Sequence, residues 1–181
     1  MRSGICNLEF AKILFPRRGQ SNFIHGIEVR GGAEFQERTR EALGLLQPLP
    51  EFALIRAYLG LIRQGKRSGM RAWATPPTFT VGAPTWSHSA LWYAGAIAHD
   101  AYHAKLYRAA KLARPAAIPR ADTWTGAAAE RACLTFQRGV LVHLDAAPSI
   151  LAYVDFQGRN PTYQGRNQGW GSWLDYRKRW W

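Results

Sequence analysis

Cysteines and acidic residues are scarce in this chain of 181 residues. The first shortage bears on disulfides and cysteine metal sites, and the second bears on the partners that the surface can attract. Two cysteines are present, Cys6 and Cys133, and their separation specifies neither a disulfide framework nor a CxxC metal site. A reducing compartment is therefore expected. The chain has 12 Asp and Glu residues and 24 Lys and Arg residues, which gives a formal net charge of +12. Such a surface attracts polyanions over roughly 8–10 Å at physiological salt, so nucleic acid and anionic lipid are candidate partners. The alternative is a basic protein whose charged side chains are simply hydrated and bind no polyanion.

Long apolar runs are also missing. No segment approaches the ~20 continuous apolar residues of a membrane-spanning helix, because Arg, Lys, Asp or His interrupts each candidate. Glu9 and Lys12 fall where a signal peptide would have its apolar centre. We therefore expect no membrane span, no standard export signal and, by default, a cytoplasmic location. The oligomeric state is not specified by the sequence.

Apolar periodicity predicts one α+β domain over residues 1–154, with residues 1–22 as a candidate flexible segment. The pattern indicates short strands near residues 26–30, 57–63, 70–74 and 78–82, and helices over residues 33–46, 90–111 and 124–144. Ser87 or Ser89 can cap the second helix, and Pro148 is expected to end the third. Residues 155–181 differ, because they share a short Gln-Gly-Arg-Asn pattern and end in basic and aromatic residues. They predict a loop-rich basic aromatic extension.

Two histidines mark the place where spacing and residue type together imply chemistry. His99 and His103 lie in the run Ala-His-Asp-Ala-Tyr-His, and residues four apart share one face of a helix, about 6 Å apart along its axis. Their imidazole nitrogens can therefore meet one metal ion. Asp100 places a carboxylate beside them, within reach of a metal-bound water. The alternative is that the two histidines are ordinary polar residues on a helix.

A catalytic metal usually takes three protein ligands, so a third must come from elsewhere in the chain. Glu130 is the strongest candidate, because it lies in an otherwise apolar helical segment where a carboxylate is costly to bury without a cationic partner. Arg131 is adjacent in sequence and therefore points elsewhere. A metal or a distant arginine is then expected to face Glu130. The other candidate third ligands are Asp145, His143 and His88.

At this point residues 68–144 resemble the zincin-like metallopeptidases of the gluzincin type. The resemblance rests on the segment ending Phe-Thr-Val-Gly at residue 82, on the His-Asp-x-x-His helix and on the later helix with its glutamate. It implies a small mixed sheet whose edge strand, packed on the active-site helix, holds the substrate backbone. It also implies Zn²⁺ bound by His99, His103 and Glu130, with Asp100 as general base where the family usually has glutamate.

Three functions follow from these patterns. The first is a zinc-dependent hydrolase that acts on a peptide or protein, in which Tyr153, Tyr163 or His143 stabilises the oxyanion. The second is a basic nucleic-acid-binding protein, suggested by the net charge and by the tryptophans among the basic residues of the C-terminus. The third is a zincin-like domain that binds metal without turnover, suggested by the shorter Asp100.

Overall fold

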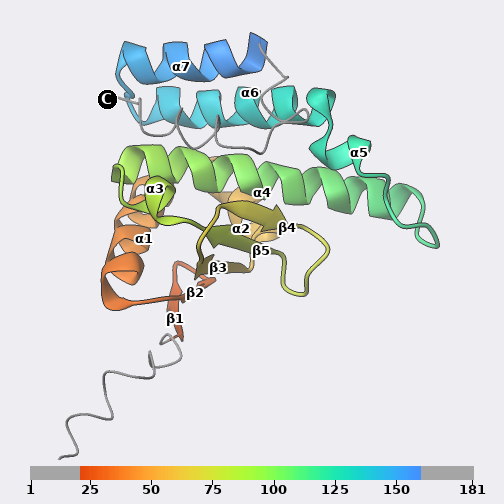
Figure 1. The fold of residues 1–181 in the computed structure, drawn as a ribbon, viewed down its shortest axis with the longest axis horizontal. Helices are drawn as coiled ribbons and strands as arrows, with labels where there is room; N and C mark the ends of the chain where they lie inside the picture. The colour runs from red at the N-terminus through yellow and green to blue at the C-terminus, as the bar shows by residue number, and fades with distance from the viewer. Residues whose placement is uncertain (1–20, 160–181) are drawn as a thin grey trace, which may run out of the picture.

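The computed structural model describes residues 21–159, which form an α+β arrangement in layers. Five short strands make one sheet, and the long helix α4 (Ala90–Ala113) lies between that sheet and α6 (Ala127–His143). The last described helix, α7 (Pro148–Arg159), packs on the side of α6 away from α4 (Figure 1). Helix α4 is therefore covered on two sides.

The sheet has mixed direction and the order β1-β2-β3-β5-β4. Strands β1 (Ser21–Ile24) and β2 (Ile27–Arg30) form an antiparallel hairpin, whose turn places His25 and Gly26 at φ values of 48° and 85°. Strand β3 (Leu61–Gln64) runs parallel to β2 and to β5 (Thr78–Val81). Strand β4 (Gly69–Arg71) pairs antiparallel with β5 and forms an edge.

Two further helices connect the parallel strands β2 and β3, and two short ones flank α4. Helices α1 (Ala33–Leu46) and α2 (Phe52–Tyr58) lie between β2 and β3, α3 (Ala83–Trp86) precedes α4, and α5 (Asp122–Thr125) precedes α6. One face of the sheet supplies buried side chains that pack with α1, α2 and α4. These strand residues are Ile24, Ile27, Val29, Ile62, Phe79 and Val81. Alternate strand residues point to the opposite face, because the side-chain period of a strand is two.

The sequence predicted most of these elements but placed the C-terminal part of the domain wrongly. Pro148 does not end a helix; it begins α7, which crosses the expected boundary at residues 154 and 155. Residues 155–159 belong to this helix. Ile150 and Val154 stabilise it, because they form a buried stripe that packs against α6. The predicted helix over residues 124–144 is two helices, divided at Gly126. The remainder of the predicted extension, 160–181, lies outside the described residues.

The N-terminal boundary also differs from the expectation. Ser21 and Asn22, placed in a candidate flexible segment, form part of β1. The rest of that segment, residues 1–20, lies outside the described residues. Ser89, one of the two expected caps, begins α4 by accepting a hydrogen bond from the Trp92 amide. In the described range 21–159, no helix is long and apolar enough to cross a membrane.

Helices α4 and α6 approach each other closely at Gly95. A Cβ atom at this position would lie 3.1 Å from Leu141 Cδ2 and 3.3 Å from Gln137 Nε2. We expect Gly95→Val to lower the free energy of unfolding by about 1–3 kcal/mol, because the added methyl groups overpack the contact. Gly139→Val on α6 is the matched control, since a Cβ at Gly139 meets nothing within 4 Å. Urea denaturation measures both changes, and equal values for the two variants would contradict this close approach.

Candidate metal centre

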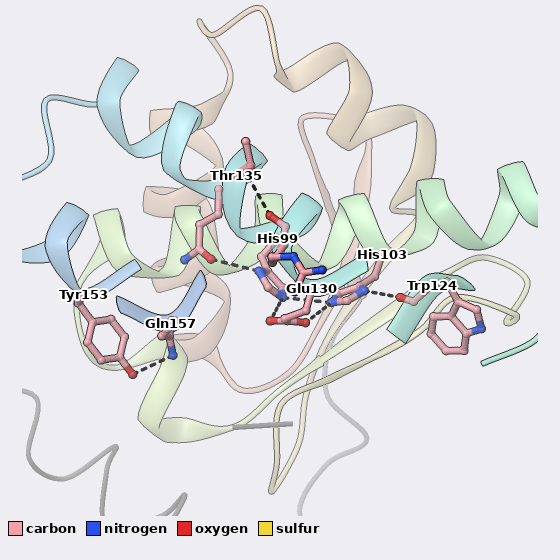
Figure 2. A network of polar contacts seen from close by, with 9 residues as sticks. His99, His103, Trp124, Glu130, Thr135, Tyr153 and Gln157 are labelled. Atoms are coloured by element: carbon pink, nitrogen blue, oxygen red, sulfur yellow. Dashed lines mark hydrogen bonds and ion pairs between the residues drawn. The ribbon is translucent and has the colours of Figure 1, made fainter. Parts of the chain in front are cut away.

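The two central helices bring the predicted ligands together. His99 and His103 stand one turn apart on α4, and Glu130 stands in the first turn of α6, directly opposite them (Figure 2). The three side chains are almost enclosed, with exposed fractions of 13% for His99, 8% for His103 and 1% for Glu130. Within the described residues the side chains that face Glu130 are these two histidines, and its ion pairs with them involve no arginine.

Two imidazole nitrogens and one carboxylate converge on one point between the helices. His99 Nε2 and His103 Nε2 are 3.1 Å apart. Glu130 places Oε1 at 3.3 Å from His99 Nε2 and Oε2 at 3.2 Å from His103 Nε2. Two ligand atoms bound to one tetrahedral zinc-sized ion at about 2.0–2.1 Å lie about 3.3 Å from each other. The observed separations match that spacing.

Hydrogen bonds on the far side of each ring fix which nitrogen carries a hydrogen. His103 Nδ1 lies 2.6 Å from the Trp124 carbonyl oxygen, and His99 Nδ1 lies 3.1 Å from Gln137 Oε1. Because carbonyl oxygens only accept hydrogen bonds, both Nδ1 atoms are donors. In the neutral rings both Nε2 atoms then present lone pairs toward the carboxylate. Metal-binding histidines usually have their other nitrogen held in this way.

This arrangement of acceptors favours a positive charge at its centre. Two lone pairs and a carboxylate that face one another in a buried site repel. A bound cation or an added proton removes that repulsion. The donor atoms, their spacing and the held rings therefore fit a divalent metal ion.

Cys133 adds a donor that the sequence did not assign to the site. It lies one turn after Glu130 on α6 and is fully buried. One nitrogen of each histidine and Cys133 Sγ all lie within 4.8 Å of one another. Burial raises the pKa of the thiol, although its hydrogen bond with His103 acts in the opposite direction. The thiol therefore stays protonated more readily than an exposed one, and a metal ion would have to displace that proton.

The surroundings of His103 strongly favour a cation in the metal-free protein. Burial alone disfavours the charged ring, but hydrogen bonds to Cys133 and Glu130, with the nearby carboxylate of Asp100, raise the pKa of His103 to about 11. A proton can thus hold the position that a metal ion would take. Metal binding must release it, so metal affinity is expected to rise with pH.

Asp100 lies beside the ligand atoms without joining them. Burial raises the pKa of its carboxyl group; His99 and His103 oppose that rise, and Glu130 adds to it. Asp100 is therefore close enough to both histidines and to Glu130 for their charges to act on its carboxyl group.

The other candidate ligands are elsewhere. His143 ends α6, where its Nδ1 lies 2.8 Å from Glu51 Oε1, and the exposed Asp145 follows it. His143 lies thirteen positions after Glu130 on α6, which is about 20 Å along the axis at 1.5 Å per residue. His88 precedes α4 and contacts the ring of Trp92. The structure therefore does not bring these three residues to the centre.

Tyr153 is also apart from the ligands. It lies on α7, where its hydroxyl accepts a hydrogen bond of 2.9 Å from Gln157 (Figure 2). Its ring contacts that of Trp92. Figure 2 shows its ring apart from the side chains of His99, His103 and Glu130. Tyr163, the other tyrosine considered for the oxyanion, lies outside the described residues.

Sequence reasoning missed the residues that support the ligands. Glu130, Cys133 and Gln137 are spaced three and four residues apart, so they form one stripe on α6 that faces α4. That spacing was a usable signal. The Trp124 carbonyl had no such signal, because it belongs to the backbone of α5. Gly126 sets its position, since a Cβ there would lie 2.6 Å from the Asp122 carbonyl oxygen.

Comparison with known proteins finds no match: no family model, no curated protein and no solved structure is similar to the chain. The case for function therefore depends on the geometry.

The raised pKa of His103 makes the stability of the metal-free protein depend on pH. The stabilisation is fully present below the ordinary pKa of 6.5 and is lost as pH rises through about 11. With chelator present, we expect the free energy of unfolding to fall between pH 7 and 9 by up to about 1.4 kcal/mol per pH unit. Urea denaturation at each pH measures it. His103→Gln should lose this slope and His143→Gln should keep it; parallel curves for wild type and His103→Gln would refute the assignment.

Proposed function

We propose that the protein is a zinc-dependent hydrolase, with a metallopeptidase of zincin-like construction as the best-supported class. The observation that carries the proposal is the convergence of His99 Nε2, His103 Nε2 and the Glu130 carboxylate at 3.1–3.3 Å. Nitrogen and oxygen donors at this spacing suit Zn²⁺, and three protein ligands leave a fourth position for water.

Each residue then has a distinct task. His99, His103 and Glu130 hold the ion, while the Trp124 carbonyl and Gln137 keep the two rings in orientation. Bound zinc would polarise a substrate carbonyl and lower the pKa of its water toward ~7. Asp100 accepts the proton of the attacking water and afterwards delivers it to the leaving amine, a role that its raised pKa supports.

The edge strand supports a peptide as the substrate. Strand β4 packs against α4 and, within the described residues, pairs with a strand on one side only. A free strand edge can add an extended peptide through main-chain hydrogen bonds. Trp73 follows β4 and contacts Trp124 edge-to-face with ring centroids 5.6 Å apart. This contact connects the strand to the segment that holds His103.

A second candidate, a metal-binding domain without turnover, is favoured by one observation. Cys133 can supply a fourth donor to the same ion, and a site closed by four protein ligands is typical of structural zinc. The small exposed fractions of the ligands point the same way. The two candidates differ in whether sulfur is bound to the ion. In the cobalt-substituted protein a thiolate-to-metal charge-transfer band, lost in Cys133→Ser, would favour the closed site.

We expect the purified protein to contain about one zinc per chain, and His99→Ala with His103→Ala to contain none. Glu130→Ala should lose most of the metal, and Gln137→Leu should weaken binding by about 10–100-fold because His99 loses its orienting partner. Metal analysis and competition with a chromogenic chelator measure these changes. His143→Ala is the matched control and should retain full zinc. A Glu130→Ala variant with unchanged zinc would remove Glu130 from the ligand set.

Asp100 separates turnover from metal binding alone. If the site hydrolyses peptides, Asp100→Asn should keep its zinc and lose about 10²–10⁴-fold in rate, because the amide cannot accept the proton. A fluorogenic peptide library provides the substrates. Asp100→Glu should retain or increase the rate, since the longer side chain restores the family's usual base. No hydrolysis by zinc-loaded wild type or by Asp100→Glu would leave the second candidate as the function.

A further inference from the structure

The outer face of the sheet carries a row of arginines. Arg30 on β2 is in register with Arg63 on β3, and Arg71 on β4 is in register with Thr78 on β5. All three arginines are exposed, and they alternate along their strands with residues that pack toward the helices. Strands lie about 4.8 Å apart, so the row spans about 14 Å from β2 to β4.

A hollow of about 880 Å³ lies over this row. Its lining contains four cationic side chains, from Arg30, Arg63, Lys66 and Arg71, and no carboxylate. Residues 74–76 of the connection between β4 and β5 form one side of it. The hollow is therefore a positively charged groove. It lies on the face of the sheet opposite to the one that packs on α4, and α4 separates the sheet from the candidate metal centre (Figure 1).

Most of this charge has no acidic partner within the described part of the chain. Arg30 Nε lies 2.7 Å from Glu28 Oε1. Arg63 donates only to the neutral hydroxyl of Thr80, at 2.9 Å. Among residues 21–159, no carboxylate forms an ion pair with Arg63, Lys66 or Arg71. The exposed arginines of α1 differ, since Arg38 pairs with Glu41 and Arg40 pairs with Glu37.

An exposed aromatic ring extends the same face. Phe23 on β1 is in register with Glu28 and is 76% exposed. Since paired residues point to the same side, its ring lies on the outer face beside Glu28, whose carboxylate pairs with Arg30. Arginines bind phosphates through a planar fork, and single-stranded nucleic acids bind proteins by combining such contacts with stacking of bases on aromatic rings. The carboxylates of an acidic peptide could bind the arginines, but they include no base that would stack on the ring of Phe23.

We propose that the outer face of the sheet is a binding site for single-stranded nucleic acid. Arg30, Arg63, Lys66 and Arg71 contact the phosphates in the groove, and Phe23 stacks on a base at its β1 side. This function is separate from the metal centre and does not require zinc or hydrolysis.

The test measures binding of a fluorescein-labelled 20-nucleotide single strand, of mixed sequence, to the full-length protein by anisotropy at several salt concentrations. Arg63→Glu with Arg71→Glu should weaken binding at least tenfold. It should also reduce the slope of log affinity against log salt by about 1.4, since each lost phosphate contact removes about 0.7. Phe23→Ala should weaken binding about tenfold without changing the slope. Arg63→Gln with Arg71→Gln gives the same direction if charge reversal disturbs folding.

Arg38→Glu with Arg40→Glu is the matched control, because it changes the net charge equally on the exposed side of α1. The proposal predicts at most a small loss for this variant. An equal loss in both double variants would overturn the site, since binding would then depend on net charge alone. Tighter binding of duplex DNA, of an acidic peptide or of anionic vesicles would overturn the choice of ligand. Zinc content should be unchanged in all four variants, so failure here leaves the proposed hydrolase untouched.

Discussion

Mutual repulsion among three acceptors is the constraint on which the rest of the domain depends. Two imidazole lone pairs and a carboxylate meet in a nearly closed space between α4 and α6. A positive charge at that point relieves the repulsion, and the three side chains that would surround it come from both central helices. In the metal-free protein the raised pKa of His103 favours a proton on its ring, which supplies that charge. The folding of the domain and the loading of its centre are therefore linked.

Residue spacing on α4 and α6 brings the three acceptor groups together. The four-residue spacing of the histidines puts both on one side of α4, and the stripe of Glu130, Cys133 and Gln137 provides donors and support from α6. The contact at Gly95 lets α6 approach closely enough for these side chains to meet. The sheet then packs on the other side of α4 and keeps its outer face available. Helix α4 thus lies between the buried centre and the sheet, so the centre and the outer face of the sheet are not in contact.

Local periodicity predicted many of the helices and strands. It failed where contacts between residues distant in sequence determine the structure. The helix over residues 33–46, the strand near residues 78–82 and the histidine-bearing helix are present with nearly the expected limits. Pro148 was misread, because proline suits the first turn of a helix as well as the end of one. Glu130 could be found because a carboxylate in an apolar helix needs a partner. The Trp124 carbonyl could not, since backbone atoms leave no trace in composition or spacing.

That last contact has a consequence for how the site tolerates change. The group that holds His103 is a carbonyl oxygen, which every amino acid possesses, so position 124 can vary in identity without loss of the hydrogen bond. The neighbouring Gly126 cannot vary in the same way, because any side chain there would collide with the Asp122 carbonyl and move the turn. Among natural variants of this domain, the glycine should therefore be kept together with the histidines, although none of its atoms takes part in the chemistry.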